Sequence, residues 1–149
     1  MRVVLQRVTR ATVRVEGETV GAIKSGLLAL VGIARDDTPE DASYLAEKIA
    51  TLRIFDDREG RMSLSLIESH GELLVVSQFT LYGDARRGRR PSWSDAASPQ
   101  LAEPLYEHFV SEARGRVGAV ATGSFRRIME VELVNDGPVT VLLDSRKAF

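Results

Sequence analysis

A short run of hydroxyl, amide and aromatic residues, Ser77-Gln78-Phe79-Thr80, follows the apolar stretch Leu73-Leu74-Val75-Val76. Polar groups at the end of a buried strand need hydrogen-bond partners, and active sites often form there. One interpretation makes Ser77, Gln78 and the local backbone N–H groups a substrate-anchoring or oxyanion site, with Thr80 as a nucleophile. The other makes the same hydroxyls partners of a neighbouring loop. No histidine or lysine stands near Thr80 in the sequence to activate it.

An arginine-rich segment is the second candidate, with Arg86, Arg87, Arg89 and Arg90 followed by Trp93. Its guanidinium groups could follow a phosphate backbone, and the indole ring could stack on a base. The alternative is a solvated charged loop.

The chain has 20 basic and 21 acidic residues and a formal net charge of −1. That balance disfavours a purely electrostatic nucleic-acid binder but fits a protein that holds one end of an RNA.

The segment Asn135-Asp136-Gly137-Pro138 has the composition of a tight turn, because Asn, Asp and Gly tolerate positive φ and proline restricts the next residue. An apolar run, Val139 to Leu143, begins directly after the proline. A Gly-Pro bond at the entrance of a strand can be cis, and such a bond holds its flanking carbonyl groups in one direction. The residues alone therefore permit cis geometry at Pro138 without requiring it.

Several kinds of site are excluded or disfavoured. The chain has no cysteine, which excludes thiol nucleophiles and thiolate metal sites. Its two histidines, His70 and His108, are too few and too isolated for a histidine-based triad or metal site, so we expect surface or packing roles. Asp56-Asp57 fits a solvated turn better than a cation site, and the glycines form neither common nucleotide-binding motif. No metal or cofactor is predicted.

The surrounding patterns predict one α+β domain over residues 1–149, with a predominantly antiparallel or barrel-like sheet and two main helices. Thr38-Pro39 should begin the first helix, whose inward stripe is Ala42, Leu45, Ile49 and Leu52. Ser98-Pro99 should begin the second, with Leu101, Leu105 and Phe109 facing inward. The expected strands are 2–8, 11–15, 19–23, 27–33, 53–55, 72–80, 127–134 and 138–143.

The first fifteen residues carry four arginines among valines, without the apolar core of a signal peptide. No apolar run reaches the ~20 residues that a membrane span needs. We therefore expect a cytoplasmic protein.

Taken in this order, the motifs resemble the D-aminoacyl-tRNA deacylase family, also called the D-tyrosyl-tRNA deacylase family. The likeness covers nearly the whole chain. Two signatures carry it, Ser77-Gln78-Phe79-Thr80-Leu81 and Asn135-Asp136-Gly137-Pro138-Val139-Thr140. Shorter matching segments are Leu5-Gln6-Arg7-Val8, Arg53-Ile54-Phe55, Gly60-Arg61-Met62, Arg90-Pro91-Ser92 and Ala97-Ser98-Pro99.

The resemblance implies an esterase that cuts the bond between a D-amino acid, or glycine, and the terminal ribose of tRNA. It implies a homodimer in which Gly137-Pro138 of one subunit, joined by a cis peptide bond, acts as a chiral filter in the pocket of the other. Backbone carbonyls cannot swing away as side chains can, so an L-side chain would be driven into them. The family picture also favours attack assisted by the ribose 2′-hydroxyl of the substrate over attack by Thr80.

By the same resemblance, Ser77, Gln78 and Phe79 line the pocket, Arg7 helps to hold the Gly-Pro element, and Phe125 and Met129 shape the pocket. The chain departs from the family pattern at Arg126-Arg127-Ile128, where small residues are usual, and at Trp93, where phenylalanine is usual. The competing hypothesis is a noncatalytic RNA-binding module that uses the arginine-rich segment.

Overall fold

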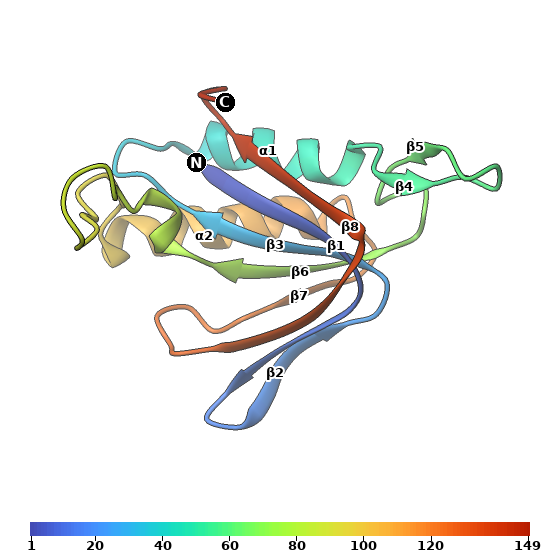
Figure 1. The fold of residues 1–149 in the computed structure, drawn as a ribbon, viewed down its shortest axis with the longest axis horizontal. Helices are drawn as coiled ribbons and strands as arrows, with labels where there is room; N and C mark the ends of the chain where they lie inside the picture. Colours follow the sequence, from blue (N-terminus) through green and yellow to red (C-terminus); the bar gives the residue numbers. More distant parts are fainter.

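One long strand, β1 (Arg2–Val15), is the axis of the sheet in the computed structural model, which describes residues 1–149 (Figure 1). Its first half pairs antiparallel with β3 (Gly26–Gly32) and its second half with β2 (Glu18–Ile23). On its other side, β8 (Glu130–Asp144) pairs with it along nearly its whole length. Alternate β1 side chains are buried, as expected for a strand with one face on a core.

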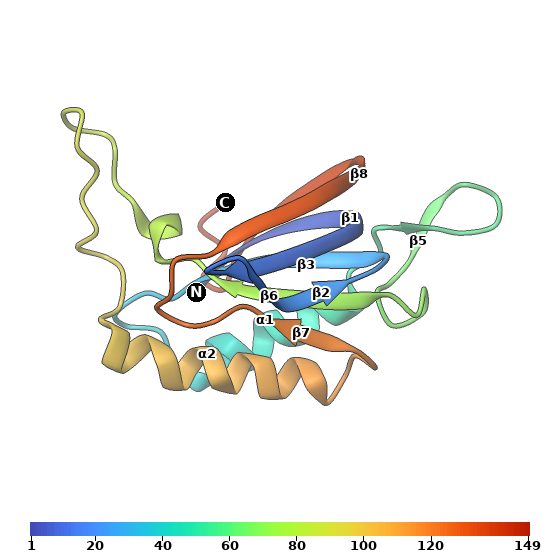
Figure 2. The ribbon, with the colours of Figure 1, turned by 90° about the horizontal axis from the view of Figure 1, so that it is seen from below.

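The rest of the sheet is parallel and is built by helical crossovers. Strand β6 (Glu72–Ser77) pairs with β3, and β7 (Val120–Thr122) pairs with β6. The crossovers contain α1 (Pro39–Thr51) and α2 (Pro99–Arg114), which lie on one face of the sheet (Figure 2). A small hairpin, β4 (Phe55–Asp56) with β5 (Met62–Leu64), extends beyond α1.

The sheet curves until β2 approaches β7, which makes it nearly a closed barrel. The backbone of Gly21 in β2 lies so near the Thr122 carbonyl oxygen in β7 that a Cβ atom at Gly21 would collide with it. Register shifts in β1, between Gln6 and Val8 and between Val8 and Arg10, mark irregularities that allow such bending. The predicted fold class is therefore confirmed, with a sheet whose pairings are mostly antiparallel.

Two hydrophobic clusters fill the space on either side of the sheet. The larger one lies between sheet and helices and includes Leu5, Leu27, Leu45 and Phe109. The smaller one lies inside the curved sheet and includes Leu28 and Leu74. Because β3 has a cluster on each face, its apolar residues are consecutive and do not alternate.

Some predicted boundaries were wrong. The strands expected at 2–8 and 11–15 are one strand, β1. The strands expected at 127–134 and 138–143 are also one strand, β8, which begins at Glu130. Both are continuous because β1 and β8 pair with each other across the two expected breaks. The strand expected through Thr80 ends at Ser77, and a 3-10 helix, η1 (Phe79–Tyr82), follows. Strand β7 was missed, since three residues are too short for a periodic pattern.

The inward stripe of α2 was also partly wrong. Leu101 is 56% exposed, whereas Tyr106, Phe109, Val110 and Ala113 are buried. Each step of four residues advances one full turn of the helix plus about 40°. Leu101, Leu105 and Phe109 therefore do not lie on one face, and Leu101 falls outside the buried side. In α1 the predicted stripe is confirmed at Ala42, Leu45 and Ile49, while Leu52 lies just past the helix end. Neither helix has the length and hydrophobicity of a membrane span.

Candidate active site

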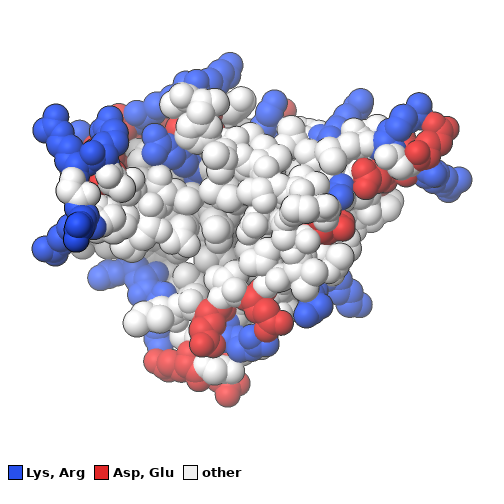
Figure 3. All heavy atoms as spheres, in the orientation of Figure 1, with Lys and Arg blue, Asp and Glu red and all other residues white.

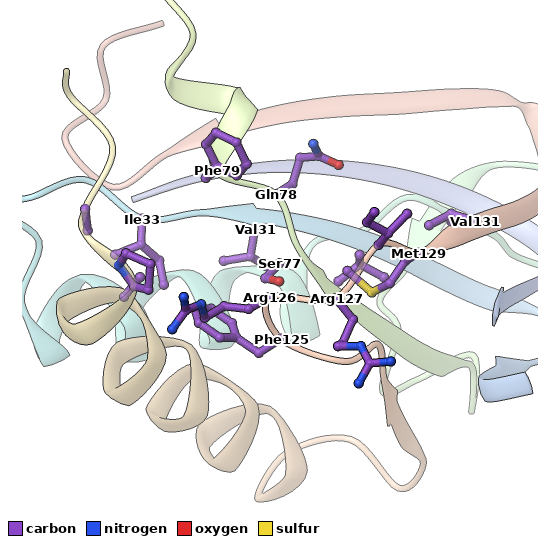
Figure 4. Close-up of a pocket in the computed structure, with 15 residues that line it drawn as sticks. Val31, Ile33, Ser77, Gln78, Phe79, Phe125, Arg126, Arg127, Met129 and Val131 are labelled. Carbon is purple, nitrogen blue, oxygen red and sulfur yellow. The ribbon is translucent and has the colours of Figure 1, made fainter. Parts of the chain in front are cut away.

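A cavity of about 560 Å³ lies between the end of β6, the beginning of α2 and the loop 123–129 (Figure 4). Small-molecule sites commonly have about 300–1,000 Å³. Ten of its fifteen lining residues are hydrophobic, so an apolar part of a ligand would be well covered. The polar side chains on its wall belong to Ser77, Gln78, Arg126 and Arg127.

The signature after β6 turns sharply at the cavity. Gln78 N–H donates to the Val31 carbonyl oxygen at 2.8 Å, which extends the pairing of β6 with β3 by one residue. The chain then enters η1, whose first residues Phe79 and Thr80 are exposed. Of the residues of this signature, Ser77, Gln78 and Phe79 line the cavity, whereas Thr80 does not. The Thr80 hydroxyl accepts a hydrogen bond from the Gln78 side-chain amide.

Two exposed aromatic rings stand at the edge of the site. The ring of Phe79, 58% exposed, meets the indole of Trp93 edge to face, with centroids 5.4 Å apart. This geometry is the favourable one for an aromatic pair. It leaves ring surface of both residues available to a ligand.

The opposite wall is anchored in the core. The Phe125 ring lies 5.6 Å from that of Tyr106, whose hydroxyl donates to the Val75 carbonyl oxygen at 3.0 Å. Burial raises the pKa of Tyr106 well above its ordinary value of 10, so it stays a neutral donor. Met129 Sδ lies 3.3 Å from the backbone nitrogen of Ser124. Phe125 and Met129 both line the cavity.

The second signature forms a separate cluster around Arg7. The Gly137-Pro138 bond is cis, as expected, and Gly137 has φ +116°. Asn135 Nδ2 donates to the carbonyl oxygens of Arg7, at 3.3 Å, and of Val139, at 3.1 Å. These two bonds tie the loop to β1 and close it upon itself.

Arg7 is itself buried beside this loop. Its Nη1 donates to the Ile54 carbonyl oxygen at 2.8 Å and lies 3.4 Å from Asp56 Oδ2. Its Nε lies 3.2 Å from Asp136 Oδ2, at an angle that leaves it without a well-aligned hydrogen bond. A Cβ atom at Gly137 would lie 3.2 Å from Arg7 Nη2. Arg7 therefore backs the Gly-Pro element directly.

The two signature clusters lie apart within one chain. The sheet register places Asn135 opposite Val8, level with the beginning of β6, whereas Ser77 ends β6 beside Val31. The two sites therefore face opposite ends of the sheet (Figure 1). Neither Gly137 nor Pro138 lines the cavity.

The arginine-rich segment lies in a loop that projects from the body between η1 and α2 (Figure 2). Arg86 makes a two-pronged ion pair with Asp84, at 2.8 and 2.7 Å, which holds the pKa of that carboxyl far below its usual value. Arg87, Arg89 and Arg90 are exposed and form no salt bridge. Positive charge accordingly gathers at this end of the molecule (Figure 3).

His70, His108 and Asp57, for which the sequence predicts structural roles, lie in turns or contact neighbouring elements. His108 Nε2 lies 2.9 Å from Ser43 Oγ, between the two helices, and His70 occupies a turn with φ +55°. Asp57 accepts hydrogen bonds from the backbone of Glu59 and Arg61 within the β4–β5 turn.

Several cavity residues could not be found from the sequence. Val31, Ile33, Ala97, Ala102 and Val131 line the cavity, but each belongs to an apolar pattern that is typical of any core. Apart from the lining residues that the resemblance names, only Arg126 and Arg127, which put two cations on the wall, carried a signal in the sequence.

Comparison with known proteins agrees with the signatures. The family model described as D-Tyr-tRNA(Tyr) deacylase matches residues 4–144. Proteins named D-aminoacyl-tRNA deacylase from Thermosipho africanus and Thermotoga petrophila are 60% and 58% identical over 149 residues, the whole of each chain.

Two solved structures have the same fold. One, of a protein named c-Myc DNA Unwinding Element Binding Protein, has a TM-score of 0.91 and 39% identity, and the match covers 97% of this chain and 98% of that one. Another, described as a probable eukaryotic D-amino acid tRNA deacylase, has a TM-score of 0.84 at 18% identity and covers 95% and 97%. At that identity the second likeness shows the fold alone. The family match over nearly all of the sequence, with relatives of this identity at full length, shows that the chain belongs to the D-Tyr-tRNA(Tyr) deacylase family.

Proposed function

We propose that this protein hydrolyses the ester between a D-amino acid, or glycine, and the 3′-terminal ribose of tRNA. Water adds across the ester, so that the products are a free amino acid and a tRNA with its ribose hydroxyl restored. The observation that carries the proposal is the full-length identity of up to 60% with proteins named for this activity, combined with a cavity at the Ser77–Phe79 signature. Because charged tRNA is the substrate, we place the activity in the cytoplasm.

The chemistry relies on position and electrostatics. Gln78 N–H is already bonded to Val31, so it is not a free donor for an oxyanion. Phe79 and Thr80 are the first residues of η1. The first N–H groups of a helical turn have no hydrogen-bond partner within that turn, so these two donors can bind a ligand. They are the candidates that stabilise the negative charge on the ester oxygen. No side-chain base contacts Thr80, so Thr80 is not activated as a nucleophile. The ribose 2′-hydroxyl of the substrate therefore assists the attack of water on the ester.

Selection against L-amino acids comes from Gly137-Pro138 of a second copy. Within one chain this element and the cavity lie at opposite ends of the sheet, so the pocket needs another subunit to complete it. A homodimer is supported by β8, which leaves one edge unpaired and exposes Leu142. Figure 3 also shows a broad uncharged area across this face.

The tRNA itself is held partly by the projecting loop. Arg87, Arg89 and Arg90 carry unpaired positive charge on this exposed loop, whereas the charge of Arg86 is matched by Asp84. The loop meets the edge of the cavity through the contact of Trp93 with Phe79. Phosphate contacts of this kind position a nucleic acid without reading its sequence.

The direct test compares the hydrolysis of D-tyrosyl-tRNA and L-tyrosyl-tRNA by purified protein with a chelator present. We expect rapid loss of the D-ester alone. If neither ester is hydrolysed, glycyl-tRNA is assayed next, and its survival would refute the esterase proposal.

The second candidate is a noncatalytic nucleic-acid-binding module. It is favoured by the basic loop and by the likeness to the 39%-identical protein, whose name refers to the binding of a DNA element. This function predicts salt-dependent binding that does not distinguish charged from uncharged tRNA, without turnover. A preference for the aminoacylated form, with hydrolysis, would exclude it.

A further inference from the structure

The loop 123–129 brings two arginines, Arg126 and Arg127, to the wall of a largely apolar cavity. None of the fifteen lining residues is an aspartate or a glutamate. Both side chains are exposed to solvent, which screens their charge, so the preference of this wall for an anion comes from the absence of a competing carboxylate. This wall of the cavity therefore favours an anionic group on the ligand.

The two arginines differ in their partners. Arg127 Nη2 lies 2.7 Å from Glu16 Oε1, and its side chain turns away from the cavity (Figure 4). Arg126 makes no salt bridge and no side-chain hydrogen bond, and its side chain extends along the cavity wall on the side of α2 (Figure 4). Arg126 is therefore the free cation of this site.

The backbone does not explain an arginine at this position. Arg126 has φ +62°, in the left-handed region that favours glycine and asparagine. The turn is held by Arg127 N–H, which donates to the Ser124 carbonyl oxygen at 3.2 Å, and by Gly123 N–H, which donates to Val75 at 2.9 Å. A glycine would satisfy this turn with less strain, so the side chain at position 126 has a use of its own.

We infer that Arg126 binds the phosphodiester on the 5′ side of the terminal adenosine of the tRNA, as a contact that positions the substrate. This inference rests on the proposed function. An ester held at Ser77–Phe79 places the terminal adenosine at the cavity, and its 5′-phosphate is then the nearest anion that every tRNA carries. The planar guanidinium fork matches phosphate oxygens. A side-chain carboxylate on the amino acid would also fit, but only acidic amino acids have one.

The test uses three substrates that differ in the phosphate: D-tyrosyl-tRNA, 3′-O-(D-tyrosyl)-AMP and 3′-O-(D-tyrosyl)-adenosine. We expect Arg126→Ala to lower kcat/KM about tenfold for the first two, a typical effect for a charge-assisted hydrogen bond, and to leave the adenosine ester unchanged. Arg126→Lys should restore part of the loss, because it keeps the charge without the fork. The control is Arg58→Ala, which removes an exposed arginine from the β4–β5 turn, at the far end of the molecule.

Three outcomes would overturn the inference. An equal loss on the adenosine ester would mean that Arg126 supports the pocket without binding phosphate. An unchanged kcat/KM of Arg126→Ala on all three substrates would show that the Arg126 side chain does not contribute to hydrolysis. With D-aspartyl-tRNA assayed as a fourth substrate, a loss on that ester and on none of the D-tyrosyl esters would move the contact to the amino-acid carboxylate.

Equilibrium binding separates this inference from the proposed function. The wild type should bind AMP about tenfold more tightly than adenosine, and Arg126→Ala should abolish that difference. If the wild type keeps the difference but hydrolyses no ester, the phosphate site stands and the esterase proposal falls. Equal affinity for AMP and adenosine in the wild type would refute the phosphate site, whatever the turnover.

Discussion

At the residue scale, Arg7 is a buried cation that joins three distant parts of the chain. It contacts the Ile54 carbonyl oxygen and the carboxylates of Asp56 and Asp136, and it backs the loop that contains Gly137. A buried charge is tolerated when it is paired and hydrogen-bonded. The position of the Gly-Pro element therefore depends on a side chain at the beginning of the chain.

Replacing Gly137 should relax the choice between D and L substrates. Gly137→Ala puts a Cβ atom on a residue with φ +116° and 2.8 Å from Val139 Cγ2, so the loop must move. We expect hydrolysis of L-tyrosyl-tRNA to rise relative to the D-ester and the free energy of unfolding to fall by about 1–3 kcal/mol. Parallel rate assays and denaturant unfolding measure both effects.

Gly60 provides the matched control. It also has positive φ, +73°, but an added Cβ would meet nothing within 4 Å. Gly60→Ala should therefore cost stability without changing the ratio of L to D hydrolysis. An unchanged ratio in Gly137→Ala as well would remove Gly137 from chiral selection.

Thr80→Ala should retain most of the activity. The Thr80 hydroxyl contacts the Gln78 amide, lies outside the cavity lining and has no base beside it. If the substrate hydroxyl assists attack, we expect kcat to fall by less than about tenfold, whereas loss of a true nucleophile typically costs several orders of magnitude. Single-turnover rates with D-tyrosyl-tRNA decide between the two, with the circular dichroism spectrum as the folding control.

At the element scale, the loop between η1 and α2 is the segment that we propose holds RNA. It projects from the body, and three of its arginines are free of acidic partners. Its base is pinned where Asp84 and Ser92 exchange backbone hydrogen bonds at 2.8 and 2.9 Å. Substitutions at its tip should therefore change binding and leave the fold intact.

Replacing Arg87, Arg89 and Arg90 together by serine should weaken the dependence of tRNA affinity on salt concentration. Each lost phosphate contact removes about 0.7–0.9 from the slope of log affinity against log salt, so we expect a decrease of about 2 to 3. Hydrolysis of 3′-O-(D-tyrosyl)-adenosine should not change, because that substrate has no phosphate. A slope equal to that of the wild type would leave the loop as a solvated surface feature.

The β4–β5 turn should make a contribution to stability that acid removes. The hydrogen bond from Ser63 Oγ and the backbone N–H donors of Arg61 and Glu59 lower the pKa of Asp57 below its ordinary 3.8. Because the folded-state pKa lies below the unfolded one, this contribution is present above about pH 4 and is lost as the pH falls. The melting temperatures of wild type and Asp57→Asn should therefore differ at pH ~7 and converge towards pH ~3. A constant difference across that range would contradict the assignment.

At the scale of the whole molecule, the proposed filter Gly137-Pro138 and the cavity of one chain are separated by the length of the sheet. The proposal that they meet across a dimer can be tested by mixing subunits. One chain carries Gly137→Ala with an intact pocket, and the other carries Phe79→Ala with an intact Gly-Pro element. In the mixed dimer the working pocket receives the intact filter of its partner, so selection against L-tyrosyl-tRNA should return.

Mixing gives no recovery if the filter acts within its own chain, because the only working pockets then keep the altered glycine. Sedimentation velocity supplies the accompanying measurement, with an expected mass twice that of the chain. A monomer at the concentrations used in the assay would rule out the cross-subunit arrangement.

Much of the fold followed from local patterns. The cap and proline at Thr38-Pro39 and at Ser98-Pro99 predicted where both helices begin, and the apolar run at 27–33 predicted a strand covered on both faces. The joins between strands were less predictable. The exposed pair Thr9-Arg10 and the turn-like Asn135–Pro138 both indicated chain breaks, yet each lies within a long strand because β1 and β8 pair across it.

The sequence by itself determined the residue types of both signatures, the absence of thiol chemistry and the family resemblance, because these depend on identity and order along the chain. Only the tertiary structure decided that Val31, Ile33 and Val131 complete the cavity wall and that Thr80 lies outside it. It also decided that Arg127 is paired and Arg126 is free. Such distinctions depend on strand register and on contacts between residues far apart in the chain, which no local pattern of hydrophobicity or charge encodes.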